Sequence, residues 1–538
     1  MTEEALPALL IAVPILGATL PLALGLVRQR IGWWVATLVL AVEAAMASWI
    51  AYAVYIGGDR ITHILGGETF GRKEVTVGSF DTEGFIVGIE LVADALSGLL
   101  VALIAFVSLG VLAYARRAGP RQNTFYSAYL LLTGGLMGLV LTGDLFNMFV
   151  FLEIVGLMTY ALVASDRSAA SAVAALKYLV IGTTGASMYL VGVGYLFVRT
   201  GTLNMVDTSR VLAGEPEWLE VTGALYTEPL VVASFGFIAV GLATKTAIFP
   251  LHTWQPGAYS EAPDSVTVLI SALVSTTSAY ALARITWVVF TPEFFAVNVK
   301  ATEAILVLAA LSVVIGSVLA AMQQRVKRVF AYSSVAQFGL IAMAIGISVH
   351  PAATDTATRF AVYGVVIHLI GHAVIKGGLF ATVGAIKKST GARSIDEYAG
   401  LATERPVLSG TLAVLGFSLI GVPPMIGFVG KWYIGLAAVK AELWPLVFVI
   451  FASTLLTLLY VARLLEKLYF TPLSETTDTA QEPAVATDGR GSVSFGMVAL
   501  AVTAAVLAVG LGFMGAELTD AIDPLVDAIQ ESSPEVHQ

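Results

Sequence analysis

The 538-residue sequence has no cysteine, few charged residues and no long basic segment. The missing cysteines exclude disulfides, thiolate metal ligands and thiol catalysis. Charged residues make up 12% of the chain, about half of the roughly 25% that a soluble domain carries, whereas 57% of the residues are hydrophobic. Basic runs stop at two or three residues, which argues against nucleic-acid binding. The composition therefore predicts an integral membrane protein.

Apolar runs of spanning length recur along most of the chain. A transmembrane helix needs about 20 predominantly apolar residues, and on that basis the sequence predicts about 14 helices. They lie near 5–26, 32–56, 90–115, 124–142, 144–165, 171–199, 228–250, 261–290, 301–323, 328–349, 359–387, 407–437, 443–470 and 493–514. The Gly-rich polar segment 57–85 is compatible with an external hairpin, and 471–491 predicts a soluble loop. The expected fold is an all-α polytopic membrane protein.

Lysine and arginine are distributed unevenly among the short loops. Loops after odd-numbered helices carry Arg28 and Arg30, Arg116 with Arg117 and Arg121, Arg167, Arg325 with Lys327 and Arg328, and Lys387 with Lys388 and Arg393. The loop at 211–228 is acidic instead. Because basic loops stay in the cytoplasm, we expect both termini to face outward from the plasma membrane.

Two predicted helices are interrupted by proline. Pro250 stands in "AIFPLHTWQP" of the seventh helix, and Pro423 and Pro424 stand in "GVPPMIGFVGKW" of the twelfth. Proline removes a backbone donor and clashes with the preceding turn. Breaks five helices apart run in opposite directions across the membrane, which is typical of inverted repeats. We expect four parts: N-terminal helices with the external loop at 1–123, repeats at 124–290 and 291–470, and the soluble loop, last helix and tail at 471–538.

Ionisable side chains occur inside several predicted helices. Each costs roughly 2.5–3.5 kcal/mol at the centre of a span and tends to mark an ion pathway. They are Glu153, Lys177, Lys245, His368, His372, Lys376 and Lys431. One buried lysine–carboxylate pair could be purely structural, but seven such residues favour proton transfer. A carboxylate shifts the pKa of a desolvated lysine, so movement of Glu153 relative to Lys245 would load or unload a proton.

Three of these residues share the segment "VVIHLIGHAVIKGGLF" at 365–380. His368, His372 and Lys376 stand at i, i+4 and i+8, within about 80° of one helix face and over a rise of about 12 Å. Histidine titrates near neutrality, so this line suits a water-bridged proton wire. The motif "HLIGH" lacks the glutamate of zinc-binding HExxH and no third ligand is evident, so we predict no metal site.

Four further polar residues lie near the ends or breaks of predicted helices. His252 follows the first break and would either relay protons or cap the broken helix. Glu261 and Asp264 begin the eighth helix, where a carboxylate favours the helix N-terminus. Asp94, near the start of the third helix, would be structural or line an entrance.

The longer motifs resemble the antiporter-like subunits of the Mrp cation/proton antiporters and of respiratory complex I, and among these they are most similar to the D-type subunit of the Mrp antiporters. The resemblance covers roughly residues 85–470. It is carried by "TGDLFNMFVFLEIVGLMTYALVA", "ALKYLVIGTTGASMYLVGVGYLF", "GLATKTAIFPLHTWQPGAY", "KRVFAYSSVAQFGLIAMAIG", "HLIGHAVIKGGLF" and "GVPPMIGFVGKW".

The resemblance implies a role for each intramembrane residue. Glu153 is similar to the fifth-helix glutamate that tunes the seventh-helix lysine, here Lys245, and Lys177 matches the sixth-helix lysine. The residues of the 365–380 segment match the central polar axis, and Lys431 matches the terminal titratable group. One position departs: the family's eighth helix carries lysine or histidine where "LVSTTSAYALAR" has Thr276. The hydroxyls of residues 275–278 can order water, but none holds a proton near neutral pH.

Four functions remain open on the sequence. The resemblance implies a proton-translocating subunit of a multisubunit Na⁺/H⁺ antiporter, working with other membrane subunits. The alternative is a proton-pumping subunit of a quinone- or ferredoxin-linked dehydrogenase or a membrane hydrogenase, with electron transfer in partner subunits, because the chain carries no redox-cofactor motif. An inorganic-carbon uptake subunit and a non-transporting scaffold are lesser alternatives. We expect no bound cofactor.

Overall fold

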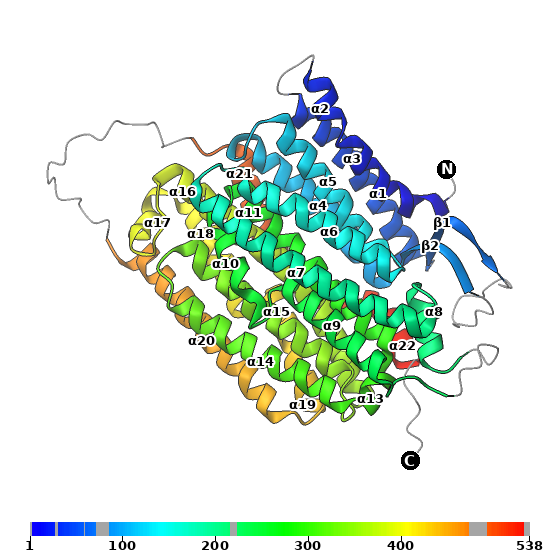
Figure 1. Ribbon diagram of the computed structural model, residues 1–538. Coiled ribbons are helices and arrows are strands. Elements are labelled where there is room, and N and C mark those ends of the chain that lie inside the picture. Colours follow the sequence, from blue (N-terminus) through cyan, green and yellow to red (C-terminus); the bar gives the residue numbers. More distant parts are fainter. Residues whose placement is uncertain are drawn as a thin grey trace.

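The computed structural model describes residues 3–26, 31–58, 60–70, 85–215, 223–472 and 492–531. Within these ranges, 13 helices are long and apolar enough to cross a membrane. They form a bundle of roughly parallel helices (Figure 1). The first seven spans comprise α1 (Leu6–Gly17) with α2 (Leu20–Gly25), α3 (Gly32–Tyr52), α4 (Ala95–Ala118), α5 (Asn123–Leu141), α6 (Leu145–Ala164), α7 (Ala169–Thr200), and α9 (Pro229–Thr246) with α10 (Gln255–Glu261).

The eighth span is divided by π-helical turns. It comprises α11 (Asp264–Leu269), α12 (Ser275–Arg284) and α13 (Thr291–Val297). The next three spans are α14 (Val299–Ala321), α15 (Val326–Ser348) and α16 (Asp355–Thr390), and the last two are α20 (Trp444–Phe470) and α21 (Phe495–Phe513). Between α16 and α20, the shorter helices α18 (Pro406–Ile420) and α19 (Ile426–Lys440) together occupy the place of the predicted twelfth helix. The all-α membrane fold is thus confirmed.

Small elements lie at the two ends of the bundle (Figure 1). One end holds β1 (Ile61–Phe70), β2 (Phe85–Ala93), α8 (Met205–Leu212) and α22 (Gly515–Glu531). The opposite end holds α17 (Leu401–Glu404). The N-terminal end of the chain and α22 lie at the same end of the bundle (Figure 1), as expected if α18 and α19 together make one further crossing beside the 13 spans.

The main correction concerns the start of the third span. The sequence predicts a helix from residue 90, but β2 continues to Ala93 and pairs antiparallel with β1, so that Ile61 faces Ala93. The helix begins only after Asp94, whose side chain accepts hydrogen bonds from the backbone of Leu96 and Ser97. An apolar strand is indistinguishable from the start of an apolar helix by composition alone.

Several predicted loop features lie partly or wholly outside the described residues. The two strands form the hairpin expected for the segment 57–85, although its tip, residues 71–84, lies outside the described residues. The basic pair Arg28 and Arg30 also lies outside them, as does the predicted loop at 471–491 apart from its first two residues.

Both predicted helix breaks are present. Helix α9 ends at Thr246, the chain turns at Ala247 with a φ of 64°, and a 3₁₀ turn over Leu251–Trp254 leads into α10. The indole N–H of Trp254 donates to the carbonyl of Thr244 at 2.9 Å, which satisfies one of the carbonyls freed at the helix end. Helix α18 ends before Gly421, whose φ of 95° suits a residue without a Cβ. Each break frees carbonyl groups at a helix end.

Candidate functional site

A partly buried charge pair joins α6 to the broken end of α9. Lys245 is 5% exposed, and its Nζ lies 3.3 Å from Oε1 of Glu153. The same ammonium group donates to the hydroxyl of Tyr160 at 3.4 Å and to the carbonyl of Leu152 at 3.5 Å. Lys245 also occupies the last turn of α9, where the helix dipole favours a cation. The structure therefore brings together the glutamate and lysine that the sequence predicted as a pair.

Thr276 contacts His372 of α16. Its Oγ1 lies 3.4 Å from Nδ1 of His372. His372 is 2% exposed and stands beside the ring of Phe338, with 4.3 Å between ring centres. Within the part of the chain that the structure describes, its Nε2 has no hydrogen-bond partner. A hydroxyl thus stands at the contact point where the family resemblance calls for a base.

Only two of the four hydroxyls at 275–278 point away from their own helix. Besides Thr276, Ser275 contacts the amide of Gln255 and the hydroxyl of Tyr259, each at 3.2 Å. Thr277 and Ser278 instead donate to the carbonyl of Val274 one turn earlier, each at 3.0 Å. Sequence reasoning missed Gln255 and Tyr259, although a glutamine close after a helix break is a signal in itself. These two residues extend the polar row from the broken seventh span toward Thr276.

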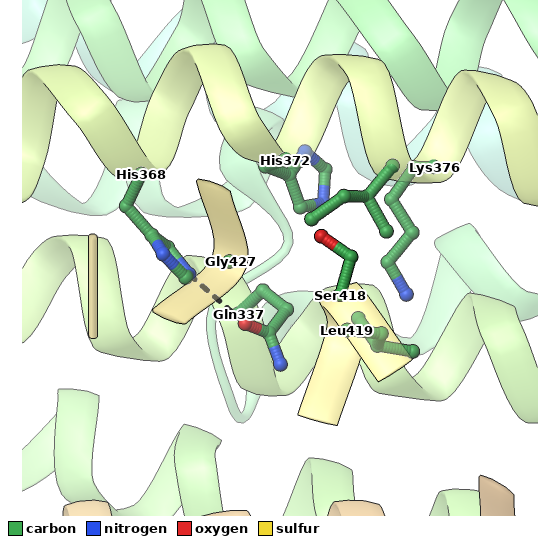
Figure 2. Close-up of a pocket in the computed structure, with 8 residues that line it drawn as sticks. Gln337, His368, His372, Lys376, Ser418, Leu419 and Gly427 are labelled. Carbon is green, nitrogen blue, oxygen red and sulfur yellow. Dashed lines mark hydrogen bonds between the residues drawn. The ribbon is translucent and has the colours of Figure 1, made fainter. Parts of the chain in front are cut away.

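The three ionisable residues of α16 project from the same side of that helix (Figure 2). Nε2 of His368 lies 2.9 Å from Oε1 of Gln337 on α15. Lys376 is fully buried, donates to the carbonyl of Phe330 at 3.0 Å and bonds the hydroxyl of Ser333. The shared face predicted from the i, i+4, i+8 spacing is confirmed.

A small cavity opens beside these side chains. Its volume of about 10 Å³ is close to the minimum that holds one water molecule. It is lined by Gln337, His368, His372, Ile375, Lys376, Ser418, Leu419 and Gly427. A water placed there would have several polar partners, as a buried water requires.

Lys431 is held by the end of a broken helix. Its Nζ donates to the carbonyls of Leu419 and Ile420, both at 2.9 Å, at the C-terminal end of α18. Lys431 is 7% exposed, and none of the ion pairs found among the described residues includes Lys376 or Lys431. Helix carbonyls carry a partial negative charge and so offset part of the desolvation cost. Because no carboxylate of the described chain neutralises either lysine, both can release a proton without breaking an ion pair.

Two predicted residues lie off the buried row. Lys177 is exposed on α7. His252 is 6% exposed in the turn after α9, with its ring centre 5.6 Å from that of Phe249 and 6.2 Å from that of Tyr332. These contacts assign His252 neither the relay nor the capping role.

The carboxylates at the helix ends make structural contacts. Asp94 caps α4 and forms an ion pair with Arg284. Asp264 is the first residue of α11, as predicted, and it also lies 2.6 Å from Nζ of Lys327 and 3.2 Å from that of Lys387. These contacts support the structural interpretation of both aspartates.

Sequence reasoning overlooked one buried carboxyl group entirely. Glu43 lies in α3, is fully buried, and neither of its side-chain oxygens has a hydrogen-bond partner among the described residues. The available signal was its position in the middle of the apolar run "GWWVATLVLAVEAAMASWIAY".

Known proteins share both the sequence and the fold. The family described as "NADH:quinone oxidoreductase/Mrp antiporter, TM" matches residues 142–457, more than half of the chain. The N-type subunit of the NADH-quinone oxidoreductase of Desulforudis audaxviator is 39% identical over 401 residues, which cover 74% of this chain and 76% of that protein. The D-type subunit of the Na⁺/H⁺ antiporter of Bacillus subtilis is 32% identical over 382 residues, covering 70% and 72%.

A solved structure agrees over nearly the full length. A chain of the membrane-bound sulfane sulfur reductase, an archaeal respiratory membrane complex, matches with a TM-score of 0.81 at 29% identity, covering 98% of this chain and 99% of that chain. The polar row from Glu153 to Lys431 lies within the matched family region. The chain is therefore a multi-pass membrane protein that belongs to the NADH:quinone oxidoreductase/Mrp antiporter transmembrane family.

Proposed function

We propose that the chain is the proton-translocating membrane subunit of a multisubunit Na⁺/H⁺ antiporter. The observation that carries the proposal is the buried polar row from Glu153 and Lys245 to Lys431, in which two lysines have no carboxylate partner among the described residues. Structural lysines in a membrane are usually paired. Unpaired ones retained in the interior point to a function that uses their protons. Membership of a family that includes an antiporter subunit of Bacillus subtilis supports the same conclusion.

The proposed path begins at the outer face of α6. Glu153 is 25% exposed on its side chain, whereas Lys245 beside it is buried, so the glutamate is the member of the pair that can exchange protons with a neighbouring subunit or with water. Separation of the pair removes the charge that stabilises the ammonium form. Lys245 then releases its proton toward the row formed by Gln255, Ser275 and Thr276.

Thr276 would act as a hydrogen-bond link rather than a proton store. A hydroxyl both donates and accepts hydrogen bonds. Thr276 can therefore donate its proton to His372 and accept a second proton from the side of Ser275. His372 has one ring nitrogen at Thr276 and one without a partner among the described residues. From His372 the proposed route continues through the small cavity to His368 and Lys376, and ends at Lys431.

The partner subunits and the orientation also belong to this proposal. We infer that other membrane subunits cover the face of Glu153 and Lys177, that the complex lies in the plasma membrane, and that both termini face outward. Because the sequence has no cysteine, single cysteines report orientation cleanly. A cysteine at Ala516 of α22 should react with a membrane-impermeant maleimide in intact cells, and one at Thr403 of α17 only in everted vesicles. The reverse pattern would overturn the orientation.

A second candidate function is a proton-pumping subunit of a redox-driven complex. It is favoured by the 39% identity to an NADH-quinone oxidoreductase subunit, compared with 32% for the antiporter subunit. Electron transfer would then reside in partner subunits, and this chain would contribute the proton path alone. The row of residues serves both functions equally.

Everted membrane vesicles distinguish the two candidates. With a ΔpH imposed, addition of Na⁺ should collapse the gradient through the wild-type complex but not through the Glu153→Ala or Lys245→Ala variants. Glu228→Ala, which removes the partly exposed partner of Arg199, is the control and should exchange at the wild-type rate. Unchanged exchange in both test variants would refute the proposed path. Proton pumping driven by a reduced donor without any Na⁺ requirement would favour the redox-driven complex.

A further inference from the structure

A large apolar groove lies between α9 and α14. Its volume is about 680 Å³, within the range of about 300–1,000 Å³ that holds a small organic molecule. Of its 20 lining residues, only Asn298 and Lys300 have polar side chains. Ordered water needs several polar partners, and protein interiors leave few voids of this size empty. An apolar ligand therefore suits the groove better than water does.

Small residues on both helices create this groove. On α9 it is lined by Gly236, Ala239 and Ala243, and on α14 by Ala301 and Ala304. Residues three or four positions apart share one face of a helix, so each helix presents a row of short side chains to the space between them. The two helices can lie side by side and still leave room for a third apolar chain.

The length of the groove matches one leaflet of a membrane. Along α14 it extends from Lys300 to Leu308, and this separation corresponds to about 12 Å at the helical rise. One leaflet is roughly 15 Å deep, half of a hydrocarbon core about 30 Å thick. Helix α14 begins at Val299, so Lys300 stands in the first turn of a spanning helix, at the depth where lipid headgroups begin.

The other end of the groove reaches the break in the seventh span. Phe249 and Pro250, in the turn after α9, line this end. Leu282 of α12 and Ala342 of α15 also line it and are buried, at 6% and 3% exposed. A chain that fills the groove would therefore pack against the turn that follows Lys245.

Lys300 supplies a cation at the end near the membrane boundary. It is exposed, and none of the ion pairs found among the described residues includes it. The amide of Asn298 is engaged, since it donates to the carbonyls of Tyr226 and Phe294 at 2.8 and 2.9 Å. Glu303, one turn further along α14, does not line the groove. An ammonium group at the end of an apolar groove is complementary to a phosphate group that carries an acyl chain.

We propose that this groove binds one acyl chain of a membrane phospholipid, whose phosphate group contacts Lys300. The chain follows the small residues of α9 and α14 and ends against the turn at Phe249 and Pro250. An isoprenoid chain without a phosphate, or apolar side chains of a partner subunit, would fill the same volume without using Lys300. The site does not depend on the proposed function, because shape and charge alone define it.

Photo-crosslinking in the assembled complex tests the site. The complex is reconstituted in nanodiscs with a phosphatidylglycerol that carries a diazirine at the end of one acyl chain, and mass spectrometry locates the crosslinks. We expect crosslinks at Phe249 and Leu282. Ala304→Phe fills the groove and should lose them, whereas Val318→Phe, at an exposed position of the same helix outside the groove, should keep them. No crosslink at either residue in the wild-type complex would overturn the proposal.

Lys300→Gln tests the phosphate contact without changing the groove. Because Lys300 is exposed, this variant should assemble normally even if Ala304→Phe does not. Its crosslinking by the phospholipid should fall, whereas crosslinking by a diazirine-bearing diacylglycerol, which has no phosphate, should equal that of the wild type. Phospholipid crosslinking that is unchanged in Lys300→Gln would refute the phosphate contact.

Discussion

Variants of Lys431 can distinguish a structural role of this residue from a role in carrying protons. Its ammonium group donates to two carbonyls at the end of α18, both at 2.9 Å. Lys431→Met would leave both buried carbonyls without these donors, at a cost of about 1–3 kcal/mol for each unsatisfied group. We expect this variant to unfold at a lower temperature and to transport poorly, so it cannot separate the two roles by itself.

Lys431→Arg separates them. Arginine keeps the positive charge and the capacity to donate to both carbonyls, but it does not lose its proton in proteins. A positioned proton-transfer group typically contributes about 10²–10⁴-fold to a rate. We therefore expect a loss of stability of only about 1–3 kcal/mol, because the larger guanidinium must fit a buried position, and Na⁺-dependent proton flux reduced at least about 100-fold.

The assay uses the purified complex in proteoliposomes, with a pH-sensitive dye for flux and intrinsic fluorescence for thermal unfolding. Lys440→Arg is the matched control, because Lys440 lies on the same helix and is exposed. Wild-type flux in Lys431→Arg would refute the claim that this lysine releases a proton.

Three further predictions follow from individual contacts. Thr276→Val should slow proton flux about tenfold because it removes the hydroxyl at the central histidine, whereas Thr277→Val, which loses only a bond to its own helix, should transport normally; equal rates would exclude the hydroxyl link. Gln337→Leu should destabilise the complex by about 1–3 kcal/mol in thermal unfolding and slow flux, because the partner of His368 is lost; an unchanged melting temperature would contradict this. Asp94→Asn should lower the free energy of unfolding by about 1.5–3 kcal/mol, because it removes the charge from a partly buried, hydrogen-bonded ion pair with Arg284 while asparagine can still cap the helix; stability equal to wild type would argue against that structural role.

The spans were predictable because lipid leaves the backbone few choices. Every spanning backbone group must be satisfied within the segment, so a run of about 20 apolar residues forms a helix. The helix breaks were predictable for a similar reason, since Pro250 and Pro424 cannot continue a helix. The helix prediction was wrong at residues 90–93, which lie at the end of the bundle and pair with β1 as a strand.

The ionisable part of the site was more predictable than the uncharged part. A lysine or histidine inside an apolar run stands out by its cost, and the common face of His368, His372 and Lys376 follows from helical spacing. Gln255 and Gln337 do not stand out by cost in this way, because an amide is costly only when it is unpaired, and their partners come from other helices. For Gln255 the remaining signal is its position just after the helix break.

The orientation of each helix was beyond the sequence. Helix α7 is apolar around much of its circumference, so nothing in its pattern indicated that Lys177 lies on the exposed side. The sequence also does not show which side of α3 is buried. Glu43, a single carboxylate near the centre of that helix, was therefore overlooked, and only the structure shows that it is completely buried.

Proton flux through a His372 variant tests the central claim most directly. His372 contacts Thr276 on one side and lines the small cavity on the other, so every proton on the proposed route passes it. In proteoliposomes, His372→Gln should reduce Na⁺-dependent proton flux about 100-fold or more, while His350→Gln, in the loop between α15 and α16, should retain the wild-type rate. Wild-type flux in His372→Gln, with the complex intact, would contradict proton transfer along this row.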